Sequence, residues 1–387
     1  MSRILFVTID AGGNVPPVIA IGHELLHGGH EVHVLGHEHQ RALAESAGFG
    51  FTAFRHMPPW EPDLAKSAAR TIRDFVRIAS DAGLGGDVHD FLEQHPADVV
   101  VVDCMLLSSL RAAEDWPAPT AVLMHTFYAF WDGRWRHGPV GALAALRGYN
   151  ARTLWGAADL ELVVADPGLD PASARATPRR VWTGAAESGV GRAAADGKGT
   201  SDESHGSVPR ILVSLSTTSL PGQAEAYQRI LTAVGSLPVH AIATTGPSID
   251  PAALNPPANV DLLAYAPHRE ILPTVSAVIG HAGHSTTMAA LAHDVPLLLM
   301  PMHPLIDQPM VAAAVARAGA GITLNRKAPP EKIGQALTTL LGDPRYATAA
   351  AQLGRRVRDA QAAAVAADQL LTLRRSSSGR IGSRMES

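Results

Sequence analysis

The residues with the clearest chemical purpose follow a short apolar run at positions 277–280. The loop His281-Ala282-Gly283-His284-Ser285-Thr286 comes directly after that run, and a helical pattern over residues 287–293 follows the loop. A helix N-terminus offers N–H groups without intrahelical acceptors and the positive end of the helix dipole, which suits a diphosphate. Ser285 and Thr286 add hydroxyl donors, and His281 adds a ring N–H. The spacing therefore predicts a diphosphate site.

A second loop in the same stretch carries groups that suit a sugar. It follows the apolar run at residues 296–300, is bounded by prolines and ends in Asp307-Gln308. A carboxylate accepts hydrogen bonds and a carboxamide both donates and accepts, so the pair matches the hydroxyls of a sugar ring. Residues 278–309 as a whole predict a site for a sugar diphosphate, and the alternative is an ordinary βαβ unit with a small-residue turn.

This stretch resembles the signature of the UDP-glycosyltransferase superfamily, which has the GT-B fold. The family pattern runs His-Gly-Gly-x-Gly-Thr, Ala-Leu, Gly-Val-Pro, Pro and Asp-Gln, and it stands here as HAGHST, AL, DVP, P and DQ with the same spacing. The resemblance covers about residues 3–372. Within the family, the chain resembles bacterial natural-product glycosyltransferases. It implies two Rossmann-like domains that face each other across a crevice.

The elements that must position these residues alternate between short apolar runs and helical patterns. This alternation is typical of a doubly wound α/β fold, in which ligands bind beyond the carboxyl ends of the strands. The predicted strands of the first half are Ile4–Ile9, Glu31–Leu35, Asp98–Val102, Thr120–Met124 and Leu160–Val164. Those of the second half are Arg210–Leu215, Val239–Ala243, Val260–Leu263, Ala277–Gly280 and Pro296–Met300.

The composition along the chain divides it into five parts. A small, polar and glycine-rich stretch without periodicity separates the two sets of strands and predicts a linker. With the roles that the resemblance implies, the parts are an acceptor-binding domain at 1–184, the linker at 185–209, a nucleotide-sugar-binding domain at 210–344, a helix at 345–373 that crosses back to the first domain, and a disordered tail at 374–387.

The resemblance also assigns donor-binding roles in the second domain. Tyr265 and His268 match the family's aromatic-x-Pro-Gln element, so Tyr265 is expected to stack on the base; a core aromatic is the alternative. Ser216 and Thr217 match a turn that contacts phosphate, and His281, Gly283, Ser285 and Thr286 match the diphosphate loop. Asp307 and Gln308 are expected to hold the sugar, with a plain surface loop as the alternative. Ala289 stands where the family often has a Glu that binds the ribose hydroxyls. Its absence weakens the inference to UDP and favours a TDP donor, which lacks the ribose 2′-hydroxyl.

The first loop departs from the family at the catalytic position. Asn14 stands where the family has a histidine general base, and Asp103 matches the aspartate that orients that histidine. A carboxamide has no titratable lone pair near pH 7 and cannot act as that base. Three interpretations remain open: another base at a strand end (Asp10, His125 or Asp103), an acceptor that needs little activation, or a protein that no longer catalyses.

An aromatic cluster follows the fourth predicted strand. Residues 125–137 contain five aromatic rings in a chain with 5% aromatic residues, which suits a flat, apolar acceptor. The predicted acceptor-binding residues are Phe127, Tyr128, Trp131 and Trp135. The alternative is that these rings fill the face of the domain.

Two further motifs partly match known metal and cofactor sites but lack features that those sites require. His23-Glu24-Leu25-Leu26-His27 spells the zinc-peptidase pattern HExxH, with His33 at the spacing of a third ligand. Gly28-Gly29 ends that helix, so no metal site is predicted. The Gly12-Gly13 loop lacks the G-x-G-x-x-G spacing of dinucleotide-binding domains, so no cofactor is expected beyond the nucleotide sugar.

Composition excludes several classes of partner. The net charge is −4 with 18% charged residues, which gives no basic face for nucleic acid. No apolar run approaches the ~18 residues of a membrane span. A single cysteine, Cys104, excludes an internal disulfide and is consistent with the cytoplasm. The sequence is compatible with a homodimer and does not decide the oligomeric state.

Together these observations predict an inverting glycosyltransferase that moves a sugar from a TDP or UDP donor to a small apolar or aromatic acceptor, such as a polyketide-type aglycone. Inversion is what the resemblance implies. The alternatives are a catalytically impaired homologue that acts as a binding or partner protein, and a sugar-nucleotide epimerase of the same fold.

Overall fold

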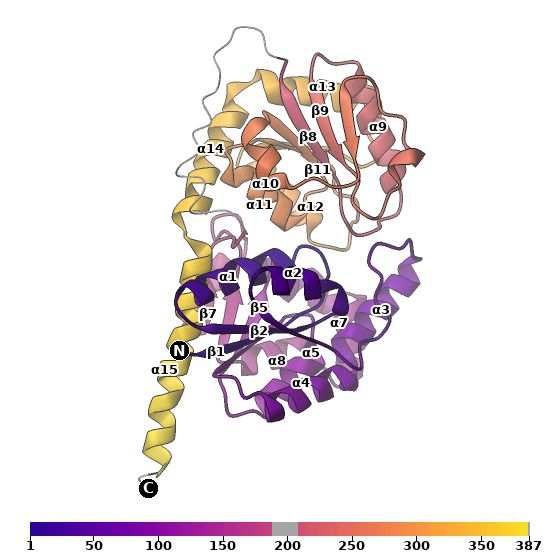
Figure 1. Ribbon diagram of the computed structural model, residues 1–387. Coiled ribbons are helices and arrows are strands. Elements are labelled where there is room, and N and C mark those ends of the chain that lie inside the picture. The colour runs from indigo at the N-terminus through magenta and orange to yellow at the C-terminus, as the bar shows by residue number, and fades with distance from the viewer. Residues whose placement is uncertain (188–207, 386–387) are drawn as a thin grey trace. The chain divides into compact units, whose positions relative to one another are not determined.

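The structure is a computed structural model that describes residues 1–187 and 208–385. These residues divide into two compact units (Figure 1). Unit 1 contains residues 1–60, 66–187 and 360–385, and unit 2 contains residues 61–65 and 208–359. Within the described residues, no helix is both long enough and apolar enough to cross a membrane.

Unit 1 is built on a seven-stranded sheet whose strands pair in parallel in the order β3-β2-β1-β4-β5-β6-β7. Its central strands are almost wholly apolar and buried, because a parallel sheet is covered by helices on both faces. The strands are β1 Arg3–Val7, β2 Glu31–Gly36, β3 Gly50–Ala53, β4 Val99–Asp103, β5 Thr120–Met124, β6 Leu160–Val163 and β7 Arg180–Trp182.

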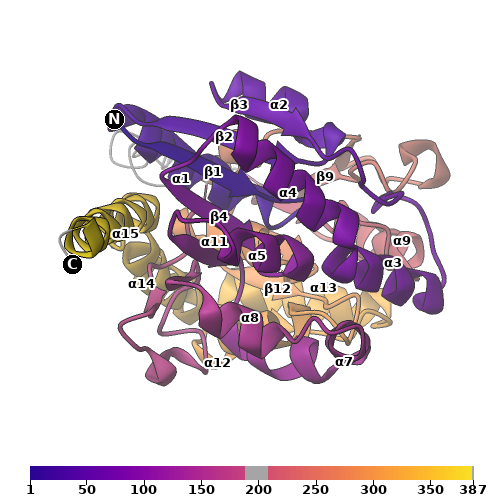
Figure 2. The same ribbon diagram turned by 90° about the horizontal axis from the view of Figure 1, so that it is seen from below.

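The helices of unit 1 connect these strands and cover the sheet. They are α1 Val15–His27, α2 Arg41–Ser46, α3 Ala68–Ser80, α4 Ala82–Gln94, α5 Leu107–Glu114, α6 Tyr128–Phe130, α7 Pro139–Leu146, α8 Ala151–Ala157 and α15 Ala362–Met385. A π-helical turn, Trp131–Trp135, continues from α6. The final helix, α15, packs along α1 although the two are far apart in sequence (Figure 2).

Unit 2 contains a six-stranded parallel sheet in the order β10-β9-β8-β11-β12-β13. Its strands are β8 Arg210–Ser214, β9 His240–Thr244, β10 Val260–Leu263, β11 Ala277–Gly280, β12 Leu297–Leu299 and β13 Gly321–Thr323. Its helices are α9 Gln223–Gly235, α10 His268–Ile271, α11 His284–Ala292, α12 Gln308–Arg317, α13 Pro330–Gly342 and α14 Pro344–Asp359. The prediction of two doubly wound α/β domains is therefore confirmed.

The end of the chain differs in detail from the prediction. The sequence predicted one helical stretch at 345–373, but two helices occupy it, and the break contains Gln361 with a φ of 44°. The first of them, α14, packs on α11 in unit 2, while α15 belongs to unit 1. The tail that was predicted to be disordered from residue 374 continues α15 to Met385, since extending an existing helix is easier than nucleating one.

The predicted strands are all present, and three short strands were missed. These are β3 at one edge of the first sheet, β7 at its other edge and β13 at an edge of the second sheet. Edge strands of three or four residues carry too few apolar positions to stand out from a loop. The predicted linker began too early, because Ala185 and Ala186 are buried in unit 1; the rest of it, to residue 207, lies outside the described residues.

Candidate functional site

In unit 2, the strand order reverses between β8 and β11, which are neighbours in the sheet. Ser214 at the end of β8 pairs in register with Gly280 at the end of β11, so the loops that follow these strands begin side by side. Such a switch point is where open α/β sheets bind ligands. The predicted phosphate-contacting residues follow these two strands: Ser216 and Thr217 follow β8, and His281 follows β11.

The imidazole of His281 lies against the N-terminus of α11. This helix begins at His284, three residues earlier than predicted, so Ser285 and Thr286 lie in its first turn. Gly283 is the N-cap residue, and a Cβ placed there would be 2.4 Å from Nε2 of His281. Only glycine therefore allows the ring to lie so close to the start of the helix.

His281 is held in its neutral form. Its pKa falls from 6.5 to about 4, mainly through burial and to a smaller extent through nearby His268, while a hydrogen bond to the Ser214 backbone offsets part of the shift. A neutral imidazole carries one N–H donor and one acceptor nitrogen. In the tautomer that does not donate to the Ser214 carbonyl, the N–H can bond to a phosphate oxygen at neutral pH without bringing a positive charge.

The second predicted pair, Asp307 and Gln308, lies where the loop after β12 enters α12. Asp307 is the half-buried N-cap residue of α12. Gln308 is buried, and its Oε1 accepts hydrogen bonds from the backbone N–H groups of Met302 (2.8 Å) and His303 (3.1 Å). Gln308 therefore fixes the loop with its oxygen, and its amide NH₂ is the part of the side chain suited to a sugar hydroxyl.

The remaining donor-side residues differ in how they are placed. Tyr265 is 79% exposed, so it is not a core aromatic. The Oγ of Ser216 accepts a hydrogen bond from the N–H of Thr218 (3.1 Å) and shapes its own turn, whereas Thr217 is exposed. Nε2 of His268 lies 3.3 Å from the Thr244 hydroxyl, and burial lowers the pKa of this histidine.

In unit 1 the equivalent switch point lies between β1 and β4, and Asn14 and Asp103 meet there. Nδ2 of Asn14 donates to Oδ2 of Asp103 (3.0 Å), to the Ile9 carbonyl (2.7 Å) and to the Thr8 hydroxyl (3.2 Å). Its Oδ1 accepts from the N–H of Ala11 (3.0 Å). Both Asn14 and Asp103 are fully buried, so the amide is a fixed donor to a buried carboxylate.

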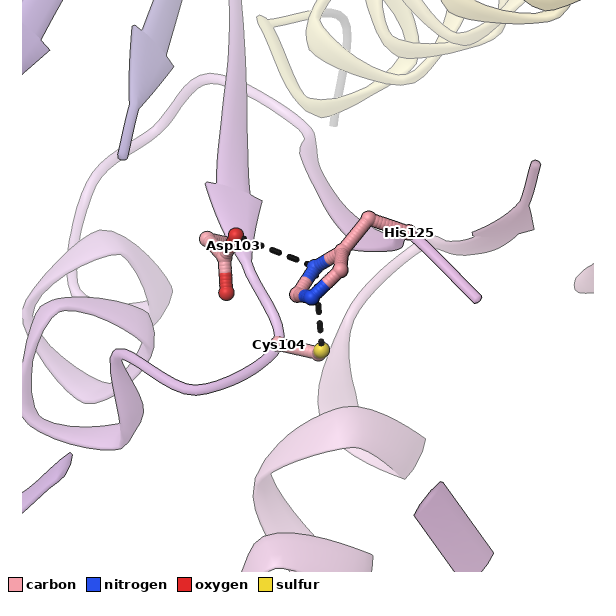
Figure 3. A group of neighbouring side chains, drawn as sticks. All are labelled: Asp103, Cys104 and His125. Atoms are coloured by element: carbon pink, nitrogen blue, oxygen red, sulfur yellow. Dashed lines mark hydrogen bonds and ion pairs between the residues drawn. The ribbon is translucent and has the colours of Figure 1, made fainter. Parts of the chain in front are cut away.

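His125 is a second partner of the same carboxylate. Its Nδ1 lies 3.2 Å from Oδ2 of Asp103 and 3.9 Å from Sγ of Cys104 (Figure 3). The ring is 9% exposed and makes an edge contact with Trp131, with 4.9 Å between the ring centroids. When Nδ1 donates to the carboxylate, Nε2 is left as the nitrogen that can take a proton.

Asp10, the third predicted base, is placed differently. Its Oδ1 accepts a hydrogen bond from the N–H of Gly12 (3.1 Å), and its backbone carbonyl accepts one from the indole of Trp60. These contacts shape the loop after β1. The structure therefore brings together two of the three predicted bases, His125 and Asp103.

The predicted acceptor-binding aromatics are buried in unit 1. Exposure is 0% for Phe127, 4% for Tyr128, 2% for Trp131 and 8% for Trp135. Trp131 contacts Trp135, which contacts Trp155, with 5.6 and 5.7 Å between centroids. The rings fill the face of the domain and form no open aromatic surface, so their role in acceptor binding stays a prediction.

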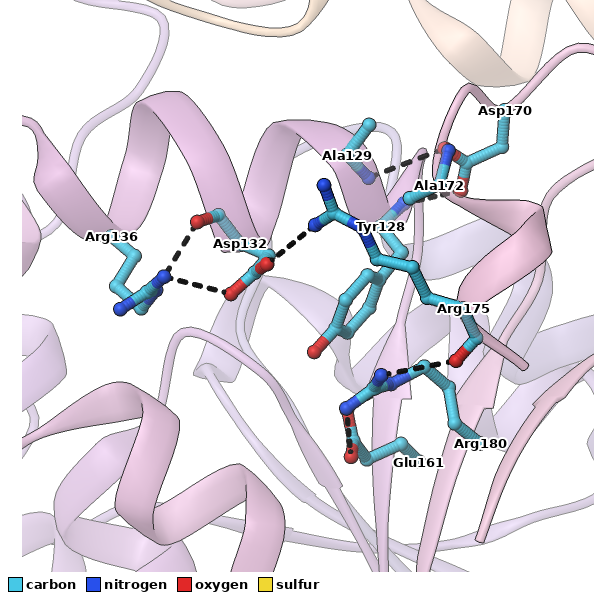
Figure 4. Close-up of polar contacts among 9 residues, drawn as sticks. All are labelled: Tyr128, Ala129, Asp132, Arg136, Glu161, Asp170, Ala172, Arg175 and Arg180. Atoms are coloured by element: carbon cyan, nitrogen blue, oxygen red, sulfur yellow. Dashed lines mark hydrogen bonds and ion pairs between the residues drawn. The ribbon is translucent and has the colours of Figure 1, made fainter. Parts of the chain in front are cut away.

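Tyr128 belongs to a polar pocket of 340 Å³ elsewhere in unit 1 (Figure 4). The guanidinium of Arg180 lies 4.2 Å from the centre of the Tyr128 ring and pairs with Glu161 (2.8 Å). Asp132 pairs with Arg175 (2.8 Å) and with Arg136 (3.0 Å). These charges are compensated by one another, which does not suit an apolar acceptor.

Two groups of side chains among the described residues have ligand atoms close enough for a metal ion: Asp103, Cys104 and His125, and the surface group His89, Asp90 and Glu93. In the first group, burial and the Asp103 charge raise the pKa of the Cys104 thiol well above its ordinary value. The thiol is then protonated and a poor ligand. The HExxH histidines form no such group within the described residues.

Sequence reasoning missed two residues that hold the unit 1 site. Thr8 accepts a hydrogen bond from Asn14, and Cys104 contacts His125. Each is next to the end of a predicted strand, so their positions could have been found by listing every polar residue there. Which partner each would hold depends on loop geometry that spacing does not reveal.

One family model, several curated proteins and several solved structures resemble this chain in sequence or fold. Residues 228–370 match the family described as the C-terminal domain of erythromycin biosynthesis protein CIII-like proteins. Elloramycin glycosyltransferase ElmGT from Streptomyces olivaceus is 40% identical over 116 residues, which are 30% of this chain and 28% of the relative. The 10-deoxymethynolide desosaminyltransferase of Streptomyces venezuelae is 32% identical over 149 residues, or 38% and 34% of the two chains. The chain thus aligns with about a third of the length of these relatives.

A solved structure matches nearly the whole chain. The glycosyltransferase of kitacinnamycin superposes with a TM-score of 0.76 at 21% identity and covers 96% of this chain and 98% of its own. At that identity the likeness establishes the fold. The chain therefore has the GT-B fold of these solved glycosyltransferases, and its residues 228–370 match the EryCIII-like C-terminal domain family.

Proposed function

We propose that this protein is a glycosyltransferase that moves a sugar from a nucleoside diphosphate to a small, largely apolar acceptor. The observation that carries the proposal is the neutral His281 ring held against the N-terminus of α11 by Gly283. A neutral N–H donor and a helix N-terminus together stabilise the charge that develops on a departing diphosphate. Gln308 and Asp307 follow the next strand of the same sheet, where a sugar attached to that diphosphate needs hydrogen-bond partners.

The acceptor is activated in unit 1 by His125, not by Asn14. The Asp103 carboxylate orients the imidazole through Nδ1, so Nε2 accepts the proton of the acceptor hydroxyl. The deprotonated oxygen attacks the anomeric carbon on the face opposite the diphosphate, through an oxocarbenium-like transition state. Such a single displacement inverts the anomeric centre.

TDP is the donor nucleotide that we favour over UDP. Ala289 offers no carboxylate for the ribose 2′-hydroxyl that distinguishes UDP from TDP. The glycosyltransferase VinC, solved in complex with DTDP, superposes with a TM-score of 0.69 at 17% identity over 97% of this chain and all of its own. The names of the relatives ElmGT and 10-deoxymethynolide desosaminyltransferase support a natural-product aglycone as acceptor.

Calorimetric titration and product analysis test the proposal. TDP and UDP should bind the purified protein, TDP more tightly, and NAD should not bind. Incubation with TDP-α-D-glucose and a phenolic acceptor should give the β-glucoside, which the anomeric proton coupling identifies. An α-glucoside would overturn the inverting mechanism, and failure of both nucleotides to bind would overturn the donor site.

Two other functions give different outcomes in the same experiment. A catalytically impaired homologue should bind a nucleotide but form no glycoside with any acceptor. An epimerase should convert one nucleotide sugar to another in the absence of an acceptor. The buried His125–Asp103 pair favours the transferase, because His125 offers a base in place of the family histidine that Asn14 replaces in this chain.

A further inference from the structure

Trp131 has a buried indole N–H without an acceptor. The side chain is 2% exposed, and its Nε1 has no hydrogen-bond partner within the described part of the chain. Two other indoles of unit 1 are satisfied: Nε1 of Trp155 donates to the Cys104 carbonyl (2.9 Å), and Nε1 of Trp182 donates to Oδ2 of Asp170 (2.9 Å). Trp131 therefore stands apart from its neighbours.

A buried donor without a partner lowers the stability of a folded protein, because the group loses its hydrogen bonds to water and gains none. A phenylalanine at the same position would fill most of the same volume without that cost. The packing of the Trp131 ring accounts for its size but not for its N–H, and a group that is absent from the free protein is the natural acceptor.

The position of the indole indicates which group this is. Trp131 contacts His125 edge-on, with 4.9 Å between ring centroids, and His125 is the base that the proposed function assigns. Trp131 also begins the π-helical turn Trp131–Trp135, a wider and less regular turn than an α-helix, and such turns recur at functional sites. The Trp131 indole is therefore near any oxygen that gives its proton to His125, and its unpaired N–H is a candidate partner for that oxygen.

We infer that the indole N–H of Trp131 donates a hydrogen bond to the attacking oxygen of the acceptor. This inference rests on the proposed function and adds a positioning residue to it. The N–H holds the hydroxyl in line with Nε2 of His125 in the ground state and stabilises the negative charge that grows on the oxygen as its proton leaves. Because the N–H is closed to solvent in the free protein, this role requires the turn that carries Trp131 to move when the acceptor binds.

Two substitutions that remove the same ring volume but different hydrogen bonds test the premise. Trp131→Phe removes a donor that has no partner and leaves only the cost of the smaller ring, so the melting temperature should fall less than in the second variant. Trp155→Phe removes a donor that is bonded to the Cys104 carbonyl, so the melting temperature should fall. If Trp131→Phe lowers the melting temperature as much as Trp155→Phe does, the N–H has an internal acceptor and the inference is wrong.

Kinetics with a phenolic acceptor, 4-methylumbelliferone, and TDP-glucose test the role itself. Trp131→Phe should lower kcat/KM for the acceptor about tenfold or more, while the Kd for TDP stays unchanged. Equal kcat/KM values in the wild type and in Trp131→Phe would overturn the inference and leave the proposed function standing. Absence of any transfer by the wild type would count against the proposed function, and the melting temperatures would still decide the premise.

Discussion

Nδ2 of Asn14 lies 3.0 Å from Oδ2 of Asp103, and Nδ1 of His125 lies 3.2 Å from the same oxygen. One buried carboxylate oxygen thus serves both an amide that cannot take a proton and an imidazole that can. The amide occupies the position at which the resemblance places a catalytic histidine. Under the proposed function, the base therefore lies after β5 instead of in the loop after β1, and the same carboxylate orients it.

Replacing Asn14 by alanine tests the amide's part in this arrangement. Asn14→Ala leaves the buried Asp103 carboxylate with one donor fewer, so the free energy of unfolding should fall by about 1–3 kcal/mol. Turnover should fall at least tenfold, because the carboxylate no longer holds His125 in a single orientation. Chemical denaturation and a transfer assay measure both effects.

Asn150→Ala is a matched control for this substitution. Oδ1 of Asn150 accepts a hydrogen bond from the N–H of Thr153 and caps α8, away from the carboxylate. Its loss should lower stability by about 1 kcal/mol and leave turnover unchanged. Unchanged turnover in Asn14→Ala would show that the amide has no part in orienting the base.

His125→Asn tests the identity of the base. The substitution removes the titratable nitrogen, so kcat should fall by about 10²–10⁴-fold, the usual contribution of general-base catalysis. The Kd for TDP should not change, because His125 belongs to unit 1 and the proposed nucleotide site to unit 2. Rapid-quench measurement of product and calorimetry of nucleotide binding separate the two quantities.

Asp10→Asn is the comparison for that experiment. Asp10 hydrogen-bonds within its own loop, and an asparagine oxygen can accept the same N–H of Gly12. Turnover should therefore stay close to that of the wild type. The reverse result, a large loss in Asp10→Asn and a small one in His125→Asn, would assign the base to Asp10.

The fold, and the position of the donor-side candidates along one sheet edge, could be predicted from sequence further than the arrangement of the catalytic candidates. Strands such as β4 are runs of β-branched residues, and the motif from His281 to Gln308 fixes the order of groups along one sheet edge. The Asn14–Asp103–His125 cluster was named only as separate candidates. These residues follow or end three different strands and are separated by up to 111 positions, and nothing in their spacing encodes a shared hydrogen bond. The burial of Trp131 and Trp135 was equally hidden, since a core and a binding surface have the same composition.

Gly283→Ala tests the contact that carries the donor site. The new Cβ would lie 2.4 Å from Nε2 of His281 and would push the ring off the start of α11. The Kd for TDP should rise at least tenfold. Gly334→Ala is the control, since a Cβ there meets nothing within 4 Å, and in helix α13 it should raise stability by about 0.5–1 kcal/mol without changing nucleotide affinity. Equal nucleotide affinity in both variants would contradict the donor site.

The pH dependence of stability tests the neutral state of His281. Its pKa is about 4 in the folded protein against 6.5 for an unperturbed histidine, so between these values the unfolded chain binds a proton that the folded protein does not. The folded state is therefore destabilised as the pH falls from about 6.5 towards about 4, and this contribution is absent above pH 6.5. His281→Gln should lose less stability than the wild type over that range, as measured by urea denaturation at each pH. Parallel curves for the two proteins would show that His281 does not remain neutral.

The most direct test of the account is mass spectrometry of the products formed by the wild-type protein from a nucleotide sugar and an aglycone. The proposed function predicts a new species whose mass equals that of the acceptor plus the sugar minus water, with one TDP or UDP released for each glycoside. His125→Asn should greatly slow the appearance of that species. A protein that binds the nucleotide sugar but yields no glycoside across a panel of phenolic and macrolide acceptors would contradict the proposed transferase.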